Sequence, residues 1–239
     1  MRRIALFLLI PMSLAACSVQ QQPIRTVETV LPAAGVSVLD VTANIGKVSI
    51  TPSSDVKVHV SVSLLSSSSF FGLFTNTDSV NAARGASLNH TLDKGTLKLG
   101  MQYPADSDDS GVNEHWTIAL PAGVHVSSHL SIGEMDVKGI SGGVDANLNV
   151  GKVLLDVPGG PLKITANVGK IQATVHSLNY SDVTLSANVG KTALTVDGVS
   201  VGDHQKAGAG DALSFKGGGK DTINLQVNTG KVDVALLTH

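Results

Sequence analysis

A short motif recurs along this chain at a nearly constant spacing. It consists of a polar residue, usually asparagine, then an aliphatic residue, then glycine, and in most copies lysine. The glycines that mark the copies are Gly46, Gly133, Gly151, Gly169, Gly190 and Gly230. Those from Gly133 to Gly190 are separated by 18, 18 and 21 residues, and the 40 residues that follow Gly190 correspond to two periods with one degenerate copy. Repeats of this length that are rich in strand-forming residues are typical of stacked coils.

Apolar and polar residues alternate within each repeat. Before one glycine, the pattern predicts that Ile164, Ala166 and Val168 point inward, and after it Ile171 resumes the alternation. Period-two alternation predicts strands with one buried face. The interval from Val168 to Ile171 shifts the phase by one residue, which would turn the second apolar set outward in a straight strand. We therefore expect a corner at Gly169, where glycine accepts a positive φ without steric cost.

These patterns predict an all-β protein that forms a single-chain β-solenoid, similar to a parallel β-helix, with coils of about 18–21 residues. The domain is expected to span residues 35–239, with more irregular strands in its N-terminal half. A cap or loop insertion is expected at residues 66–90, including a short helix over Asp78–Arg84. The apolar segment Phe70–Phe74 has two interpretations, a cap over the open end of the stack or an exposed tip that contacts a membrane or partner.

The N-terminus is typical of a secreted lipoprotein. Residues 1–16 combine two arginines, a short apolar run and small residues before Cys17, which predicts a signal peptide and not a membrane span. Leu14 to Cys17 resembles the bacterial lipobox, so Cys17 is expected to carry the lipid that attaches the protein to a membrane. Residues 17–34 are expected to form a flexible tether. Ser18 resembles the sorting signal for the outer membrane of Gram-negative bacteria.

Stacked coils would place equivalent residues of the repeats in columns. The asparagines before the glycines would form a hydrogen-bonded ladder, which we interpret as structural. The lysines after the glycines would form a stripe made of Lys152, Lys170, Lys191 and Lys231. This stripe is either a docking site for an anionic polymer or a solvated edge balanced by nearby acidic residues.

The end of one predicted strand, Leu120 to Gly123, together with the glycine repeats, resembles the bacterial "putative adhesin" β-solenoid domains over residues 35–237. The resemblance implies a membrane-attached protein with an adhesin-like role and carries no catalytic residues. Many members have an acidic residue where this chain has lysine after the glycine.

Composition restricts the remaining functional classes. After removal of residues 1–16 the formal net charge is about −4, with no basic cluster, so no nucleic-acid partner is expected. The sequence contains no recognised catalytic or metal-binding motif, so we expect no enzyme activity, metal or cofactor. The favoured function is a non-catalytic, adhesin-like scaffold whose partner is a glycan or an envelope protein. The alternatives are a structural envelope protein that acts by assembly and, more weakly, a carbohydrate-active solenoid enzyme.

Overall fold

The computed structural model describes residues 22–66 and 77–238. The signal peptide at residues 1–16, Cys17 with the first part of the tether, and Phe70–Phe74 lie outside the described residues. The described part is all-β apart from one short helix, and its 14 strands belong to one sheet.

The sheet is built from strands of very different length. The elements are β1 (Arg25–Pro32), β2 (Val38–Pro52), β3 (Lys57–Ser66), α1 (Thr77–Gly85), β4 (Ser87–Asp93), β5 (Thr96–Gln102), β6 (Val112–Leu120), β7 (His125–Lys138), β8 (Val144–Val157), β9 (Leu162–Val175), β10 (Tyr180–Val196), β11 (Val199–Ser200), β12 (Asp203–Ala207), β13 (Gly210–Lys216) and β14 (Asp221–Leu236). Helix α1 confirms the short helix predicted within the insertion.

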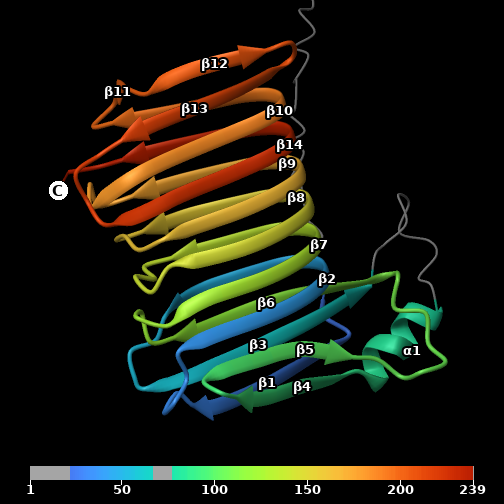
Figure 1. Ribbon diagram of the computed structural model, residues 1–239. Helices are drawn as coiled ribbons and strands as arrows, with labels where there is room; N and C mark the ends of the chain where they lie inside the picture. Colours follow the sequence, from blue (N-terminus) through green and yellow to red (C-terminus); the bar gives the residue numbers. More distant parts are fainter. Residues whose placement is uncertain (1–21, 67–76, 239) are drawn as a thin grey trace, which may run out of the picture.

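Six long strands form a parallel stack in the order β2-β7-β8-β9-β14-β10 (Figure 1). Their repeats are aligned in register. Gly133 pairs with Gly46 and Gly151, and Gly151 pairs with Gly169. The predicted alignment of the glycine motifs is therefore confirmed from β2 to β9.

Each long strand of the stack continues through its glycine but bends there. Figure 1 shows these strands turning back, so that the two halves of each strand lie in two layers. The core lies between the layers, where Val144, Ala146 and Leu148 before a glycine and Val153 and Leu155 after it are all at most 4% exposed.

The inward-facing residues end two positions earlier than the alternation predicts. Val168 and Val189, which we expected to point inward, are 42% and 49% exposed. Ala166 is the last buried residue before Gly169, and Ile171 is the first after it. The two positions before the glycine lie on the outside of the bend, so the alternation of inward and outward side chains does not hold there.

The order of the last strands corrects the expected stacking in sequence order. Strand β14 lies between β9 and β10, in parallel with both. Residues 197–216, expected to contain a degenerate coil, instead turn at Asp197 and Gly198, both with positive φ, and form the antiparallel β12–β13 hairpin. Because β13 pairs antiparallel with residues 182–187 of β10, that edge of β10 is occupied and β14 pairs on the other edge.

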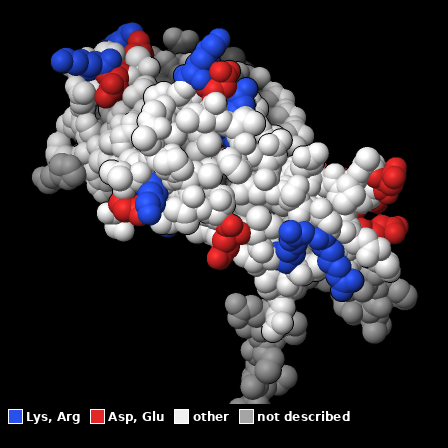
Figure 2. Space-filling view, turned by 90° about the horizontal axis from the view of Figure 1, so that it is seen from below, with Lys and Arg blue, Asp and Glu red and all other residues white. Residues whose placement is uncertain are grey.

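The N-terminal end of the stack is where the two layers separate. The first half of β2 pairs with β5, and its second half pairs with β6, which is followed by β3 and β1. Residues 25–32 are therefore strand β1 and not tether, because they pair antiparallel with β3 and every second side chain from Val27 to Leu31 is half-buried. Figure 2 views the molecule from this end and shows basic and acidic residues in small scattered groups, some of both signs and some of one, on a largely uncharged surface.

Candidate functional site

The asparagines that precede the glycines form a hydrogen-bonded ladder along the stack. The side-chain amide of Asn188 donates to Asn228 Oδ1 at 2.9 Å, that of Asn228 to Asn167 Oδ1 at 3.2 Å, and that of Asn167 to Asn149 Oδ1 at 3.2 Å. Ser131 occupies the same position in β7. We call these five residues the ladder column.

The ladder lies where the backbone pairing between neighbouring strands is interrupted. The register of β8 with β9 includes the residues on both sides of Asn149 and Asn167 but omits these two. The same position is omitted between β9 and β14. The side-chain bonds thus connect neighbouring strands at the one position of the bend where the backbone pairing is interrupted.

The glycine column lies beside the ladder and admits no side chain. Gly169 has φ +151°, and a Cβ placed there would lie 1.8 Å from the carbonyl oxygen of Gly151. The other five glycines of the motif have φ between +139° and +146° and meet a neighbouring backbone oxygen at 1.7–2.1 Å in the same way. Two reasons therefore demand glycine at each bend, the backbone angle and the close approach of the next strand.

The lysine stripe exists as a column, but its charge is partly neutralised. Strand pairing places Lys152, Lys170, Lys231 and Lys191 in neighbouring positions, with Glu134 next to Lys152. In the stripe, Lys170 and Lys231 form ion pairs with Asp233 at 3.6 and 2.8 Å. Lys47, at the equivalent position of β2, pairs with Glu134 at 2.8 Å. The hydrogen bond between Lys47 and Glu134 raises the pKa of the lysine and lowers the pKa of the glutamate. Whether the column binds an anionic polymer stays a prediction.

The outside of the bend carries an exposed aliphatic ridge. Its members precede the glycines and are 39–49% exposed: Ile132, Val150, Val168 and Val189. Thr229 takes the equivalent place in β14, which interrupts the ridge with a polar side chain.

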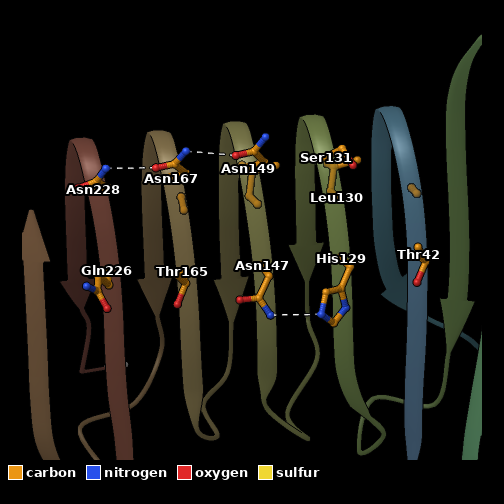
Figure 3. Close-up of a pocket in the computed structure, with 13 residues that line it drawn as sticks. Thr42, His129, Leu130, Ser131, Asn147, Asn149, Thr165, Asn167, Gln226 and Asn228 are labelled. Carbon is orange, nitrogen blue, oxygen red and sulfur yellow. Dashed lines mark hydrogen bonds between the residues drawn. The ribbon is translucent and has the colours of Figure 1, made fainter. Parts of the chain in front are cut away.

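A second polar column runs parallel to the ladder, two residues earlier on each strand. We call it the mixed column, and it consists of Thr42, His129, Asn147, Thr165 and Gln226. Figure 3 shows its side chains in a row below the ladder, on neighbouring strands. This column forms no visible repeat in the sequence, because its side chains are of four kinds; the one signal for it is a polar residue four positions before each glycine.

The ladder column and the mixed column border a groove with a volume of about 430 Å³. Between them lie the inward-facing residues Ala43, Leu130, Leu148 and Ala166, so the backbone of these residues forms the floor. The lining contains amide and hydroxyl groups and one imidazole, but no Asp, Glu, Lys or Arg. The groove crosses the strands and follows the stack.

His129 links the mixed column to an acidic neighbour. Its Nε2 lies 3.5 Å from Asn147 Nδ2, and its Nδ1 lies 4.0 Å from Asp40 Oδ1. That Asp40 oxygen is buried and has no hydrogen-bond partner within the described chain. Donation from Asn147 requires an unprotonated Nε2, which places the proton of neutral His129 on Nδ1, facing Asp40.

Among the residues that the structure describes, two carboxylate side chains are buried, and they lie at the ends of the stack, away from the groove. Glu114 of β6 pairs with Gly46, at the position where the other neighbouring strands have glycine. It is 2% exposed and accepts hydrogen bonds at 2.8 Å from Trp116 Nε1 and from Tyr103 Oη. Burial raises the pKa of Glu114, although these hydrogen bonds oppose the effect.

Asp211 lies at the opposite end of the stack, in β13. It accepts hydrogen bonds from both the backbone N–H and the hydroxyl of Thr192, at 3.0 and 2.9 Å, and lies 3.0 Å from His204 Nδ1. Burial acts to raise the pKa of Asp211, but the hydrogen bonds from His204 and Thr192 outweigh it, so that the pKa is lowered.

Residues 22–66 and 77–238 contain no group of three or more His, Cys, Asp or Glu side chains arranged to hold a metal ion. Helix α1, the one helix in these ranges, is too short to cross a membrane.

The fold has a counterpart among solved structures. A protein described as a putative cell adhesion protein from Clostridium sporogenes ATCC 15579 aligns with a TM-score of 0.57 and 16% identity, over 90% of this chain and 100% of that chain. At this identity the likeness shows a shared fold.

Two further structures align less well. They are described as putative adhesins from Bacteroides fragilis NCTC 9343 (TM-score 0.26, 10% identity, 88% of this chain and 97% of that chain) and Parabacteroides distasonis ATCC 8503 (TM-score 0.27, 11% identity, 89% and 97%). These scores are too low to indicate a shared fold. No protein-family model matches the sequence, and no curated protein matches it significantly.

Proposed function

We propose that this protein is a lipid-anchored, non-catalytic, adhesin-like binding scaffold of the bacterial cell envelope, and that its bent parallel strands are the coils of a single-chain β-solenoid. The observation that carries the proposal is the groove between the ladder column and the mixed column. It is a groove in which two rows of polar side chains border aliphatic residues, and a hollow that combines apolar lining with a few placed polar groups is a common form of ligand site.

The groove has the rigidity that a binding scaffold needs. Its side chains stand on strands, which position groups better than loops do. The ladder bonds restrain Asn149, Asn167 and Asn228 before any ligand arrives. A pre-ordered surface binds with a smaller loss of conformational entropy.

The non-catalytic assignment is supported by the chemistry of the lining. Amides and hydroxyls hold ligands by hydrogen bonding but are poor proton-transfer groups at neutral pH, so that His129 is the one acid–base candidate among the lining residues. The buried Glu114 and Asp211 stand outside the groove lining.

The anchor follows from the lipobox. Acylation of Cys17 would attach the protein to the outer membrane, with only residues 18–24 between the lipid and β1. A tether this short spans at most roughly 25 Å when extended, which would hold the N-terminal end of the stack near the membrane.

The proposal is tested with the full-length chain expressed in a Gram-negative host, with Cys17→Ala as the control. We expect the protein in the outer-membrane fraction, its Cys17→Ala form released, and cells bearing the lipidated form retained on immobilised envelope glycans. Equal membrane attachment of both forms would refute the anchor. Cells that adhere no better than cells lacking the protein would refute the adhesin-like role.

Assembly into a structural envelope protein is the second candidate, and the aliphatic ridge is the observation that favours it. Exposed aliphatic rows are suited to contacts between proteins. Sedimentation of the detergent-solubilised protein with Val150→Ser and Val168→Ser, compared with Thr165→Ser on the same face, tests this candidate. A wild-type oligomer that dissociates only in the valine variant would establish assembly through the ridge.

A further inference from the structure

We infer that the groove binds a neutral polysaccharide in an extended conformation, with its chain running along the stack and crossing the strands. This inference deepens the proposed function and rests on it. It names the class of ligand, its direction, and the residues that hold it.

The charge distribution selects a neutral ligand. No charged side chain lines the groove, although the whole chain contains 17 Lys and Arg and 19 Asp and Glu residues. An anionic ligand in the groove would lose hydration without gaining a cation partner, which is unfavourable. The lysines that could attract an anion lie beyond the glycine bend, on the other half of each strand.

The hydrogen-bonding capacity of the groove selects a polyhydroxylated ligand. An asparagine side chain has two N–H donors and an oxygen with two lone pairs. At Asn167 the ladder uses one donor toward Asn149 and one lone pair toward Asn228, which leaves one donor and one lone pair. Thr165 and Gln226 across the groove also donate and accept. Sugar hydroxyls need this combination, since each of them both donates and accepts a hydrogen bond.

The periodicity of the groove selects a polymer. Adjacent strands are about 4.8 Å apart, so side chains that can hydrogen-bond recur at that interval from Thr42 to Gln226 in one column and from Ser131 to Asn228 in the other. A chain of repeating sugar units would meet similar partners again at each strand. Affinity should therefore increase with the number of linked units, as in multivalent binding.

The test uses the lipidated full-length protein in detergent and isothermal titration calorimetry. The probes are two neutral polymers, dextran and glucomannan, their short oligosaccharides, and the anionic polymer alginate. Thr165→Arg places a long charged side chain in the groove. Gln172→Arg is the matched control, because it faces outward on the other half of the same strand. Lys152→Gln with Lys191→Gln tests the lysine column.

We expect a neutral polymer to bind more tightly than its oligosaccharide. Thr165→Arg should weaken this binding by about ten-fold or more, while Gln172→Arg and the lysine variant stay within about two-fold of wild type. Unchanged thermal unfolding of Thr165→Arg would show that the loss is local.

Two results would overturn the inference. Binding of alginate that depends on Lys152 and Lys191 but not on Thr165 would move the ligand site to the lysine column, and the proposed scaffold function would stand. Binding of none of the polymers, in a protein that still makes cells adhere, would exclude the polysaccharide and leave adhesion to another partner. If adhesion is absent as well, the proposed function fails together with the inference.

Discussion

The side-chain amide of Asn228 donates to Asn167 Oδ1 at 3.2 Å, although 61 positions separate the two residues in the sequence. Asn188, much closer to Asn167 along the chain, is bonded to Asn228 instead. The order of the asparagines in the ladder thus follows the order of the strands, with β14 between β9 and β10. The last strand of the chain lies inside the stack, and this placement determines how the end of the molecule is stabilised.

Removal of β14 is expected to abolish cooperative folding. A chain that ends at Gly218 would lose the strand that pairs with both β9 and β10, together with its buried residues Ile223, Leu225 and Val227. Each such side chain contributes about 1.5–3 kcal/mol on burial. Urea unfolding followed by the fluorescence of Trp116 measures the effect, with a chain ending at Leu237 as control. A cooperative transition near that of the control would show that β14 is peripheral.

Asn167→Ala is expected to lower the free energy of unfolding by about 1 kcal/mol, because it removes a ladder hydrogen bond on each side of an exposed residue. Asn224→Ala is the matched control, since Asn224 also faces outward in the same layer but lies outside the ladder. The control should stay within about 0.5 kcal/mol of wild type in urea titrations. Equal effects of the two substitutions would mean that the ladder does not stabilise the fold.

Gly169→Ala is expected to lower the free energy of unfolding by about 3–5 kcal/mol, because both the backbone angle and the oxygen of Gly151 oppose a Cβ. Gly123→Ala is the control, since a Cβ there meets no atom within 4 Å. Differential scanning calorimetry should show a large drop in Tm for the first variant and little change for the second. A Tm of Gly169→Ala close to wild type would contradict the close-packed bend.

Two buried hydroxyls are expected to respond in opposite ways to removal. Ser128 is 1% exposed and its hydroxyl has no hydrogen-bond partner in the described chain, so Ser128→Ala should raise the free energy of unfolding by about 1 kcal/mol. Thr192 donates to Asp211 at 2.9 Å, so Thr192→Val should lower it by about 1–3 kcal/mol. Urea titration of both variants provides the comparison. Destabilisation by Ser128→Ala would indicate that its hydroxyl is hydrogen-bonded.

Glu114 is expected to make stability fall as the pH rises. Burial raises the pKa of Glu114 in the folded protein above the value of about 4.3 in the unfolded chain, so the folded state holds the proton more tightly. Its contribution is therefore fully present below about pH 4.3 and is lost as the pH rises through the folded pKa. Unfolding free energies of wild type and Glu114→Gln at about pH 4 and pH 7 provide the measurement. Wild type should lose stability relative to the variant between these values, and a constant difference would refute the raised pKa.

Much of the repeat could be predicted from local pattern. Alternation predicts the strands, and the recurring glycine predicts both the bend and the alignment of Gly133, Gly151 and Gly169, which strand pairing confirms. The asparagine ladder followed from the same alignment. The local pattern was wrong for Val168. This residue lies on the outside of the bend, where a side chain points to solvent whatever its place in the alternation.

The groove could not be predicted in the same way. Its mixed column uses five residues of four kinds, Thr42, His129, Asn147, Thr165 and Gln226. A column of different side chains gives no visible repeat in the sequence, and what its members share is a position relative to the bend. They come together only because in-register pairing places the fourth residue before each glycine on adjacent strands.

The sequence alone determined the long repeat strands, most of their inward faces and the glycine at each bend, because these depend on neighbouring residues, on backbone angles and on the size of one side chain. The tertiary structure decided the order of the last strands and the lining of the groove. Strand order depends on which edges remain open once β13 has paired with β10, and the groove depends on which strands then become neighbours. Both are relations between distant segments, which local preferences do not encode.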